Sequence, residues 1–439
     1  MRAGVCGAVA MAVAIFSGGA AFATVEEASM REGPAMTESS IYNVRDFGAQ
    51  GDGTTDDTAA FQAALDAAGK AGGGIVRAPR GVYLIAGHLS VPMAVALEGI
   101  WQAPPSHPGL RDKGAPTPEY GTVLLAVEGK GDEDGTPFIT LANNTTLKGV
   151  VIYYPKQDRK VAPPAPYPWT IRMRGSNMAV LDCELLNPYQ AIDARLAHRH
   201  LIRNIHGQPL RRGILVDQIY DIGRIENVHF NPWWSMEKDL FEWQMENGEA
   251  FVFGRTDWHY VQNTFCYGYK IGYRFIKTQK GVCNGNFLGI GADDCLVAIQ
   301  IDQAAPYGLL ITNGEFVSFR GPDPTMVVVS KTNTGVVRFV NCSYWGPNKQ
   351  IARIAGTGTV GFSDCNFMAW DKDKEGRAAI QVESGTVLVR GCFFRKDAPQ
   401  ITLGPKVARA VIAENVFTGP ERITNNSTGS VQIGLNAAK

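Results

Sequence analysis

VNCSYW, residues 340–345, is the first of four related segments near the C-terminus of the chain. The others are SDCNFM around Cys365, RGCFFR around Cys392 and AENVFT around Asn415. Each places an aromatic residue two positions after a central Cys or Asn, and the four central residues stand 23, 27 and 23 positions apart. A repeat of about 20–30 residues that is rich in β-branched and aromatic side chains is typical of a solenoid.

The same spacing continues toward the N-terminus. The central positions that we assign in the preceding repeats are Gly314, Gly285, Asn263, Val228, Ile205 and Cys183. The residue before each central position is mostly Asn, Asp or Gly, the types that tolerate the left-handed backbone region. In chain order these are Asp182, Asn204, Asn227, Gln262, Asn284, Asn313, Asn341, Asp364, Gly391 and Glu414. The pattern predicts an all-β fold, a right-handed single-stranded parallel β-helix. Its coils are expected to lie about 4.8 Å apart, and the same turn is expected to recur in each coil.

The cysteine count is compatible with this fold. The chain has 8 cysteines. Cys6 lies in an expected export signal, which leaves an odd number in the exported protein and argues against a complete disulfide framework. We therefore expect Cys342, Cys365 and Cys392 to be free, and to stack inside the coils as small apolar side chains.

An acidic segment near the N-terminus, DFGAQGDGTTDDT at residues 46–58, has two interpretations. Its aspartates could hold a metal or act in catalysis, but the spacing of a calcium loop is missing. The following residues predict a short amphipathic helix that Asp57 or Thr58 caps and that glycines end after residue 68. Phe61, Ala64, Leu65 and Ala68 share one face of it. We favour architecture: the helix covers the open end of the solenoid, and the acids brace the preceding turn.

NVRDFGAQGDGTTDDTAAFQAALDAA, followed by GVYLI, closely resembles the N-terminal signature of the pectate-lyase-like superfamily of parallel β-helix proteins. That superfamily includes polygalacturonases, rhamnogalacturonases, exo-β-1,3-glucanases and phage tailspikes. The resemblance implies a β-helix over residues 41–439 with a short N-terminal capping helix. It does not specify the substrate, because the superfamily acts on many glycans by hydrolysis and by elimination.

Residues 1–23 are typical of an export signal: Arg2, an apolar run, and an Ala-x-Ala site that predicts cleavage after Ala23. Residues 24–40 are polar and read as a flexible lead-in, so we expect a secreted or periplasmic protein. Lys+Arg and Asp+Glu are both 42, which argues against nucleic acid as a partner. No second segment is long and apolar enough to predict membrane insertion, and the sequence does not specify an oligomeric state.

GIGADDCLVAI, residues 289–299, resembles the DDC-aliphatic-A-I stretch of polygalacturonase-type hydrolases. The resemblance implies that Asp293 and Asp294 face a glycan groove, and we predict that they act in catalysis. Carboxyl groups on neighbouring coils fall near the ~6.5–9.5 Å separation of an inverting hydrolase, so Glu315 on the next coil or Asp257 on the previous one is the predicted partner. Paired carboxyl groups at such spacing suit acid–base hydrolysis. The alternative is that Asp293 and Asp294 are turn residues. The N-T-D, G-H-G and R-I-K motifs of that family are absent, which places the polygalacturonase subfamily in doubt.

Aromatic and polar residues concentrate in residues 221–275, where the repeat is longest. Flat aromatic rings stack on the apolar faces of sugars, and polar groups fix the hydroxyls. The substrate-binding residues that we predict are Trp233, Trp234, Trp258, His259, Arg255, Tyr267 and Lys270. A second cluster of histidines and arginines is interpreted as a solvated basic strip, with a subsite for acidic sugars as the alternative. Its members are His198, His200, His206, His229, Arg199, Arg203, Arg211 and Arg212.

The sequence therefore predicts a secreted enzyme that cleaves a polysaccharide or oligosaccharide, with hydrolysis by paired carboxylates as the leading reaction. The first alternative is a polysaccharide lyase acting by β-elimination on a uronate-containing glycan. The second is a non-catalytic glycan-binding surface protein on the same scaffold. No cofactor and no metal are expected.

Overall fold

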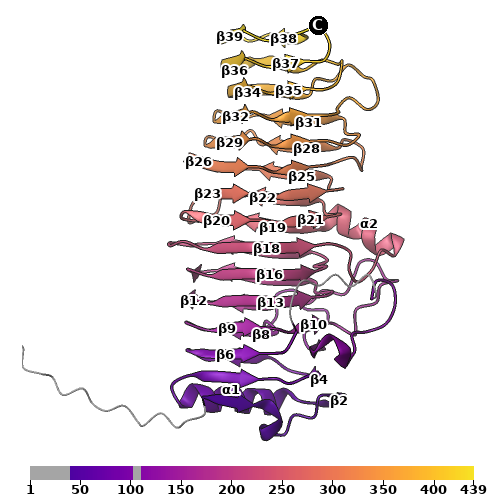
Figure 1. The fold of residues 1–439 in the computed structure, drawn as a ribbon, viewed down its shortest axis with the longest axis vertical. Coiled ribbons are helices and arrows are strands. Elements are labelled where there is room, and N and C mark those ends of the chain that lie inside the picture. The colour runs from indigo at the N-terminus through magenta and orange to yellow at the C-terminus, as the bar shows by residue number, and fades with distance from the viewer. Residues whose placement is uncertain (1–39, 102–109) are drawn as a thin grey trace, which may run out of the picture. The chain divides into compact units, whose positions relative to one another are not determined.

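The computed structural model describes residues 40–101 and 110–439. The predicted signal and the lead-in, apart from Ser40, lie outside the described residues. The chain winds into a right-handed parallel β-helix, and every strand-to-strand ladder within it is parallel. The first strand is β1 (Ile41–Asn43) and the last is β39 (Ser430–Gly434). Figure 1 shows the coils stacked in chain order, from the indigo N-terminal coils at one end to β39 at the other. The predicted fold class is thereby confirmed.

Three sheets run along the column, and most coils contribute one strand or part of a strand to each. Sheet A contains β5 (Leu89–Val91), β8 (Ile139–Leu141), β11 (Trp169–Met173), β14 (Gln190–Arg195), β17 (Arg212–Asp217), β19 (Glu249–Phe253), β22 (Ile271–Phe275), β25 (Val297–Ile301), β28 (Thr325–Val329), β31 (Gln350–Ile354), the first parts of β34 (Ile380–Arg390) and β36 (Ile401–Ala413), and β38 (Ile423–Asn425). Sheet B contains β1, β3 (Gly74–Arg77), β6 (Val95–Glu98), β9 (Thr146–Lys148), β13 (Ala179–Leu185), β16 (Leu201–Gly207), β18 (Arg224–Phe230), β20 (His259–Gln262), β23 (Cys283–Leu288), β26 (Ala304–Thr312), β29 (Val336–Val340), β32 (Thr359–Ser363), the later parts of β34 and β36, and β39.

Sheet C follows sheet B in each coil. It contains β2 (Asp52–Asp56), β4 (Gly81–Ile85), β7 (Thr122–Ala126), β10 (Val151–Tyr153), the ends of β13, β16 and β18, β21 (Phe265–Tyr267), β24 (Gly291–Asp293), β27 (Glu315–Phe316), β30 (Ser343–Tyr344), β33 (Asn366–Phe367), β35 (Phe393–Phe394) and β37 (Val416–Phe417). Outside the three sheets lie the short pair β12 (Gly175–Ser176) and β15 (Ala197–His198), and the 3-10 turns η1 (Val44–Phe47) and η2 (Pro118–Tyr120).

The core lies inside the coil, because alternate residues of each strand point inward. Like side chains therefore stack from coil to coil. The rings of Phe251 and Tyr273 lie 4.8 Å apart at 10°, and those of Phe339 and Phe362 lie 5.0 Å apart at 10°. The aromatic residues that define the sequence repeat near the C-terminus form a further buried column: Phe316, Tyr344, Phe367, Phe394 and Phe417 follow one another with ring centres 4.6–5.5 Å apart.

The turn between sheets B and C is the one that the sequence repeat marks. Asp182, Asn204 and Asn227 adopt φ of 51°, 55° and 50°, inside the left-handed region. Their side chains bond along the column: Asn204 Nδ2 donates to Asp182 Oδ1 at 2.6 Å, and Asn227 Nδ2 donates to Asn204 Oδ1 at 2.8 Å. The ladder satisfies polar groups at each turn and holds the coils in register.

Two of the assigned repeats are wrong in register. The left-handed turn residues there are Asn263 and Gly289, and not the predicted Gln262 and Asn284. The central positions move accordingly from Asn263 and Gly285 to Thr264 and Ile290. The reason is that β23 runs straight through Gly285, which pairs with His259, so the CNGNF segment lies inside a strand and precedes the turn.

The cysteines behave as the repeat predicts. Cys342, Cys365 and Cys392 are buried and free, and each thiol donates to a carbonyl oxygen of an earlier coil, at 3.6–3.7 Å. Burial raises the pKa of the Cys183 thiol to about 12. These side chains fill space as small apolar groups.

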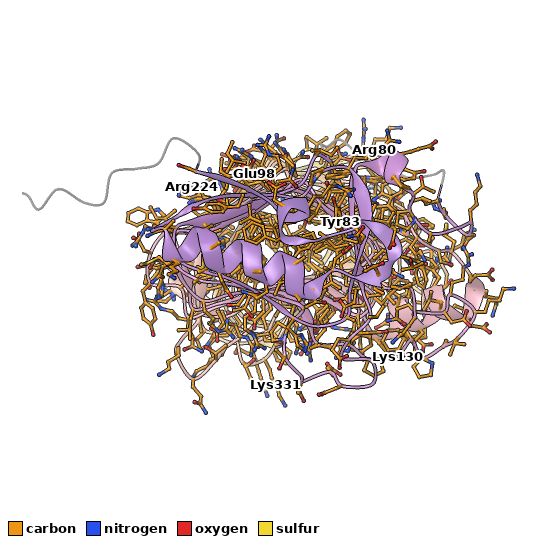
Figure 2. The ribbon with its side chains drawn as sticks, turned by 90° about the horizontal axis from the view of Figure 1, so that it is seen from below. Arg80, Tyr83, Glu98, Lys130, Arg224 and Lys331 are labelled. Carbon is orange, nitrogen blue, oxygen red and sulfur yellow. The ribbon has the colours of Figure 1, made fainter. Side chains whose placement is uncertain are left out.

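The predicted capping helix is α1 (Thr58–Lys70). Its buried residues are Phe61, Ala64, Leu65 and Ala68, the same face that the sequence indicates. Figure 2 looks along the column and shows α1 lying across its end, with Tyr83 of the first coils beside it. The rings of Phe61 and Tyr83 meet edge-on at 5.0 Å. The helix thus covers core that the first coils would otherwise expose at the N-terminal end of the column.

The aspartates before α1 stabilise the turn that leads into the helix, but their contacts differ from the predicted helix cap. Asp57 occupies the N-cap position but makes no capping bond; its carboxylate accepts the N–H groups of Gln50 at 2.6 Å and Gly51 at 3.0 Å. Asp56 instead accepts the N–H of Thr58 at 3.0 Å. Because these carboxylates are used by backbone donors, the segment is architectural.

The long repeat around residue 240 carries α2 (Lys238–Asn247), which projects from the side of the column in Figure 1. Its buried residues are Leu240, Phe241, Gln244 and Met245. Neither described helix has the length and apolarity needed to cross a membrane.

Candidate functional site: a charged groove on sheet A

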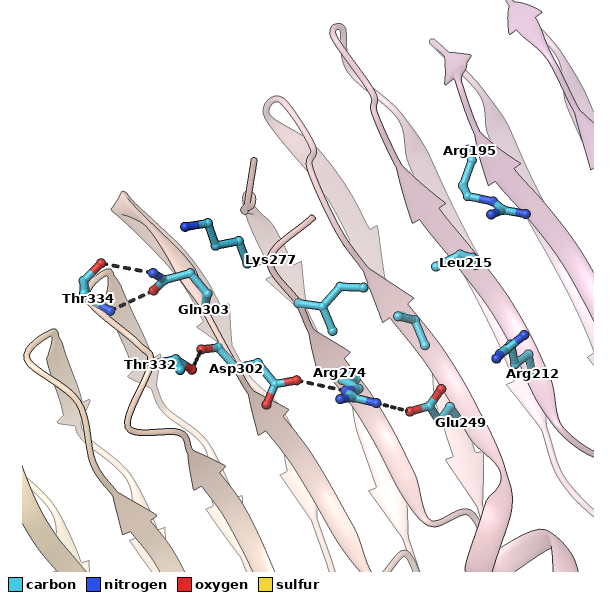
Figure 3. A pocket seen from close by; sticks show the side chains of 12 residues that line it. Arg195, Arg212, Leu215, Glu249, Arg274, Lys277, Asp302, Gln303, Thr332 and Thr334 are labelled. Atoms are coloured by element: carbon cyan, nitrogen blue, oxygen red, sulfur yellow. Dashed lines mark hydrogen bonds and ion pairs between the residues drawn. The ribbon is translucent and has the colours of Figure 1, made fainter. Parts of the chain in front are cut away.

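A hollow of about 920 Å³ runs along the outer face of sheet A, across β14 to β25 (Figure 3). We call it the sheet A groove. Its lining residues are Arg195, Arg212, Leu215, Glu249, Val252, Arg274, Ile276, Lys277, Asp302, Gln303, Thr332 and Thr334.

Strand alternation places these residues. Phe251 of β19 and Tyr273 of β22 are paired in register and point into the core. The next residue of each strand, Val252 or Arg274, must then point outward, and these two are also paired. The groove wall is therefore the outward set of a sheet whose inward set is aromatic and aliphatic.

Arg274 is the centre of an ion-pair chain along the groove. Its Nη1 donates to Glu249 Oε1 at 2.6 Å on the preceding coil, and its Nε donates to Asp302 Oδ2 at 3.0 Å on the following one (Figure 3). Burial lowers the pKa of Arg274, but the hydrogen bonds that it donates to both carboxylates more than offset this and raise the pKa above its usual value. One guanidinium thus links three successive coils.

Asp193 organises the cationic end of the groove. Its side chain is fully buried and accepts hydrogen bonds from Arg172, Arg174 and Arg195 at 3.1, 2.9 and 2.8 Å. Burial opposes its charge, yet the bonds with Arg195 and Arg174 hold the pKa of Asp193 below its usual range. Since one carboxylate serves three guanidiniums, positive charge is left over at this end.

The groove carries more cations than anions. Arg212 pairs with Glu133 at 3.1 Å, while Arg195 and Arg274 are paired as described. Of the four lining cations, all within the described part of the chain, Lys277 is the one that makes no ion pair; its side chain is exposed. Two of the lining residues, Glu249 and Asp302, are acids, and Asp193 and Glu133 stand just outside the lining as partners of Arg195 and Arg212. The exposed ammonium group of Lys277 is therefore the lining cation left for an anionic ligand.

The predicted catalytic pair lies elsewhere, at the corner after sheet C. Asp294 is fully buried with φ of 51°, and its Oδ2 lies 2.5 Å from Arg320 Nε. Asp293 ends β24 and is half-buried. Burial raises the pKa of both carboxyl groups, and Arg320 partly opposes this for Asp294. Of the two residues expected to face a groove, Asp294 is turned into a buried ion pair, whereas Asp293 remains partly exposed.

The predicted partners do not join Asp294. Glu315 is exposed on β27 of sheet C, paired in register with Gly291, two residues before Asp293. Asp257 lines a different hollow, on the sheet B side, together with Trp258. The structure therefore places Glu315 on the same sheet as Asp293 and separates Asp257 from both.

The predicted sugar-binding aromatics are divided in the same way. Trp234 is buried in a small core with Leu186 and Leu240, so its ring is not available to a substrate. Trp233 is partly buried against His229, with ring centres 5.2 Å apart. Tyr267 is partly buried and stacks on Phe241 of α2 at 6.0 Å.

The predicted polar contacts are also dispersed. His259 is fully buried against His200, with the two Nε2 atoms 3.1 Å apart. Arg255 stacks over Tyr220 at 4.0 Å from the ring centre. Lys270 is exposed, and Trp258 is exposed over 63% of its surface.

The histidine and arginine cluster is not one solvated strip. His200 and His206 are buried, whereas Arg199 pairs with Asp221 at 2.8 Å on the surface. Arg212 alone of the cluster lines the sheet A groove.

The sequence reasoning missed Arg195, Arg274, Lys277 and Asp302 as groove residues. A usable signal was present, since the strand segments FVF and YRF place one outward residue between two buried rings. To place these segments on one sheet, the turn residues Asn263 and Gly289 of the two repeats must be identified correctly. The aromatic pattern alone did not identify them.

Comparison with known proteins agrees with this fold. Residues 41–112 match the family model described as rhamnogalacturonase A/epimerase, pectate lyase-like. A 46-residue stretch, 10% of the chain, is 67% identical to alginate lyase 7 of Azotobacter vinelandii and 65% identical to the mannuronan C5-epimerase AlgE1 of the same organism. These stretches cover 5% and 3% of those two proteins.

Solved structures extend the similarity over the whole β-helix. The catalytic unit of a GH87 α-1,3-glucanase from Streptomyces thermodiastaticus superposes with a TM-score of 0.53 at 14% identity, over 92% of this chain and 71% of that one. A DFA-IIIase from Arthrobacter chlorophenolicus superposes with a TM-score of 0.52 at 10% identity, over 90% and 99%. At such identities the likeness shows the fold alone. The predicted resemblance to pectate-lyase-like β-helix proteins is confirmed.

Proposed function

We propose that this protein is an exported carbohydrate-active enzyme that binds an acidic polysaccharide in the sheet A groove and cleaves it by β-elimination at a uronate residue. The observation that carries the proposal is the lining of the groove: it holds four cations and two carboxylates, and one of these cations, Lys277, has no carboxylate partner among the described residues. Export is inferred from the N-terminal signal sequence.

The arginines suit the first requirement of elimination. A uronate carboxylate must be neutralised before the hydrogen on the adjacent carbon becomes acidic enough to remove, and guanidinium groups bind carboxylates in a fixed geometry. Arg195, Arg212 and Arg274 line the groove on separate strands of sheet A. A chain of sugars lying along the column would meet them in turn.

Lys277 suits the second requirement. It follows β22 by two residues at the edge of the groove and has no carboxylate partner within the described residues. As the base of the proposed reaction, its amine takes the proton from the carbon next to the uronate carboxylate. The bond to the glycosidic oxygen at C4 then breaks, a C4–C5 double bond forms, and the leaving oxygen takes a proton from solvent in the open groove.

The names of related proteins favour an acidic substrate, and the ion pairs of the groove carboxylates argue against hydrolysis there. The relatives that share the 46-residue stretch are named as an alginate lyase and as epimerases acting at C5 of mannuronan. Hydrolysis, in contrast, needs one carboxyl group that donates a proton while a second acts as base or nucleophile. Glu249 and Asp302 are both engaged by Arg274, so neither is free for that role.

Hydrolysis remains the second candidate, on a specific observation at Asp293 and Asp294. Burial raises the pKa of both carboxyl groups, which is the property that a general acid needs. This candidate places the chemistry at the corner between β24 and β25, outside the sheet A groove.

The products distinguish the candidates. The protein should be incubated with soluble uronate polymers and with neutral polysaccharides, while near-ultraviolet absorbance and reducing ends are followed. Elimination raises both signals with the uronate polymer, whereas hydrolysis raises reducing ends alone. Lys277→Gln should abolish the absorbance change. Lys406→Gln, at an exposed lysine on β36, is the matched control and should leave it unchanged. Saturable binding without product would favour the non-catalytic alternative.

A further inference from the structure

We propose that a second hollow, on sheet B, is a binding site for a neutral saccharide, separate from the sheet A groove. It measures about 430 Å³ and we call it the Trp258 hollow. Its lining residues are Asp257, Trp258, Asn284, Gly285, Asn286, Tyr307, Gly308 and Leu310. The inference does not depend on the reaction proposed for the groove.

The two sites lie on different sheets. The Trp258 hollow crosses β20, β23 and β26 of sheet B, where Tyr260, Asn286 and Leu310 are paired in register and point outward. The sheet A groove crosses β14 to β25 and shares no lining residue with it. A glycan held in the hollow therefore leaves the groove open.

Trp258 is held in an exposed position by its backbone. It adopts φ of 52°, which is unfavourable for a bulky residue, and its N–H donates to Asn284 Oδ1 at 2.7 Å. In earlier coils the equivalent position, two residues before the register partners Ala179, Leu201 and Arg224, holds Asn177, Arg199 and Ile222, and none of these is aromatic. This coil instead presents an indole with 63% of its surface exposed. An exposed ring in a strained backbone position indicates a role in binding.

Tyr307 is pushed outward by a bulge in β26. The register against β23 jumps from Ala304, opposite Cys283, to Leu309, opposite Gly285, so the intervening residues of β26 have no partner in that ladder. Tyr307 lies at this bulge and is exposed over 73% of its surface. Bulges commonly re-aim a side chain next to a functional site. The result is a second aromatic ring bordering the same hollow as Trp258.

The remaining lining residues suit hydroxyl groups. Asn284 and Asn286 also line the hollow, and a pyranose has apolar faces for the rings and hydroxyls for side-chain amides. Among the described residues that line the hollow, Asp257 is the one that carries a charge, and it repels a uronate carboxylate. The hollow therefore suits neutral sugar units, in contrast with the cationic groove.

The test is a fluorescence titration of the full protein with cellohexaose, mannohexaose and laminarihexaose, with a uronate hexamer for contrast. We expect at least one neutral hexasaccharide to change tryptophan emission saturably. Trp258→Ala and Tyr307→Ala should each weaken this binding about tenfold, the loss expected for one stacked ring. Trp258→Phe should retain part of it, because a ring remains.

Two control variants distinguish binding in the Trp258 hollow from binding elsewhere on the protein. Arg274→Gln, in the sheet A groove, should leave the binding of neutral hexasaccharides unchanged. Failure of the groove proposal can then be distinguished from failure of the proposal for the Trp258 hollow. Trp345→Ala removes an exposed ring that follows β30 of sheet C and should also have no effect. The proposal is overturned if none of the three neutral hexasaccharides binds, or if the Trp258→Ala Tyr307→Ala double variant binds them as the wild type does.

Discussion

Arg274 Nη1 lies 2.6 Å from Glu249 Oε1, and this ion pair crosses from one coil of the β-helix to the next in the floor of the sheet A groove. Only 12% of the Glu249 side chain is exposed, so water competes little with Arg274 for this carboxylate. Asp302 binds the same guanidinium from the other side at 3.0 Å. The arrangement fixes a cation where an extended acidic polymer lying along the column would pass.

Replacing this arginine should impair turnover more than folding. In the proposed elimination Arg274→Gln removes a charge that would neutralise the substrate carboxylate. We therefore expect kcat/KM on a uronate polymer to fall by about 100-fold or more, the loss typical of removing one group that stabilises developing charge. Steady-state kinetics with the active polymer measures this.

Arg353 provides the control for that variant. It occupies the same outward column of sheet A three coils further on, where it pairs with Asp323 at 3.0 Å. Arg353→Gln should leave kcat/KM close to the wild-type value. Equal losses in both variants would mean that the groove has no special role.

Asp294 should behave as a structural residue. Its buried carboxylate faces Arg320, and Asp294→Ala leaves that guanidinium without its partner. Because Arg320 is partly exposed and can turn to water, we expect a loss of about 1–3 kcal/mol in the free energy of unfolding. Asp293→Ala, at a half-buried neighbour, should cost less. Urea unfolding curves check both, and an unchanged midpoint for Asp294→Ala would contradict the buried ion pair.

The thiols should be inert in the native state. The seven cysteines from Cys183 to Cys392 are buried and free. A thiol reagent should leave them unmodified for hours in the native protein and modify all seven once the chain is unfolded without reductant. Fast labelling of native Cys342, Cys365 or Cys392, or a disulfide between any two, would be incompatible with the stacked arrangement.

The buried histidine pair should make the fold sensitive to acid. His200 Nδ1 donates to the carbonyl oxygen of Ala197 at 2.6 Å, and its Nε2 meets that of His259. Burial lowers the pKa of His200 to about 4, and that of His259 is also lowered by burial and by its neighbour.

Proton binding decides whether acid raises or lowers the free energy of unfolding. Between about pH 6.5 and pH 4 the unfolded chain takes up protons that the folded protein refuses, so the free energy of unfolding falls as the pH falls through this window. Melting temperatures measured across it should show the loss, and His259→Gln should flatten the slope. An identical slope in that variant would remove the pair as its cause.

The fold could be predicted because the same turn residues and buried positions recur in the sequence of each coil. The residues before Cys183, Ile205 and Val228 are Asp or Asn, and each adopts the left-handed turn that these types tolerate. The buried face of the capping helix was predictable to the residue, since Phe61, Ala64, Leu65 and Ala68 lie together at helical spacing and need a core to pack against.

The site was less predictable because its residues come from strands far apart in sequence. Arg195, Arg274 and Asp302 carry no local motif, and only the strand register brings them together. The DDC segment is a recognisable motif, but the tertiary pairing with Arg320 turns Asp294 into the interior. Exposure of aromatics was similarly hidden: Trp234 and Trp258 look alike in sequence, yet one is buried and the other exposed.

The central claim is that the sheet A groove supports elimination on an acidic polysaccharide, and the most direct test is the product itself. Wild-type protein and Lys277→Gln should be incubated with soluble uronate polymers while near-ultraviolet absorbance and reducing ends are recorded together. We expect both signals to rise in step for the wild type and neither to rise for Lys277→Gln. Reducing ends that form without absorbance, or a Lys277→Gln variant as active as the wild type, would contradict elimination in this groove.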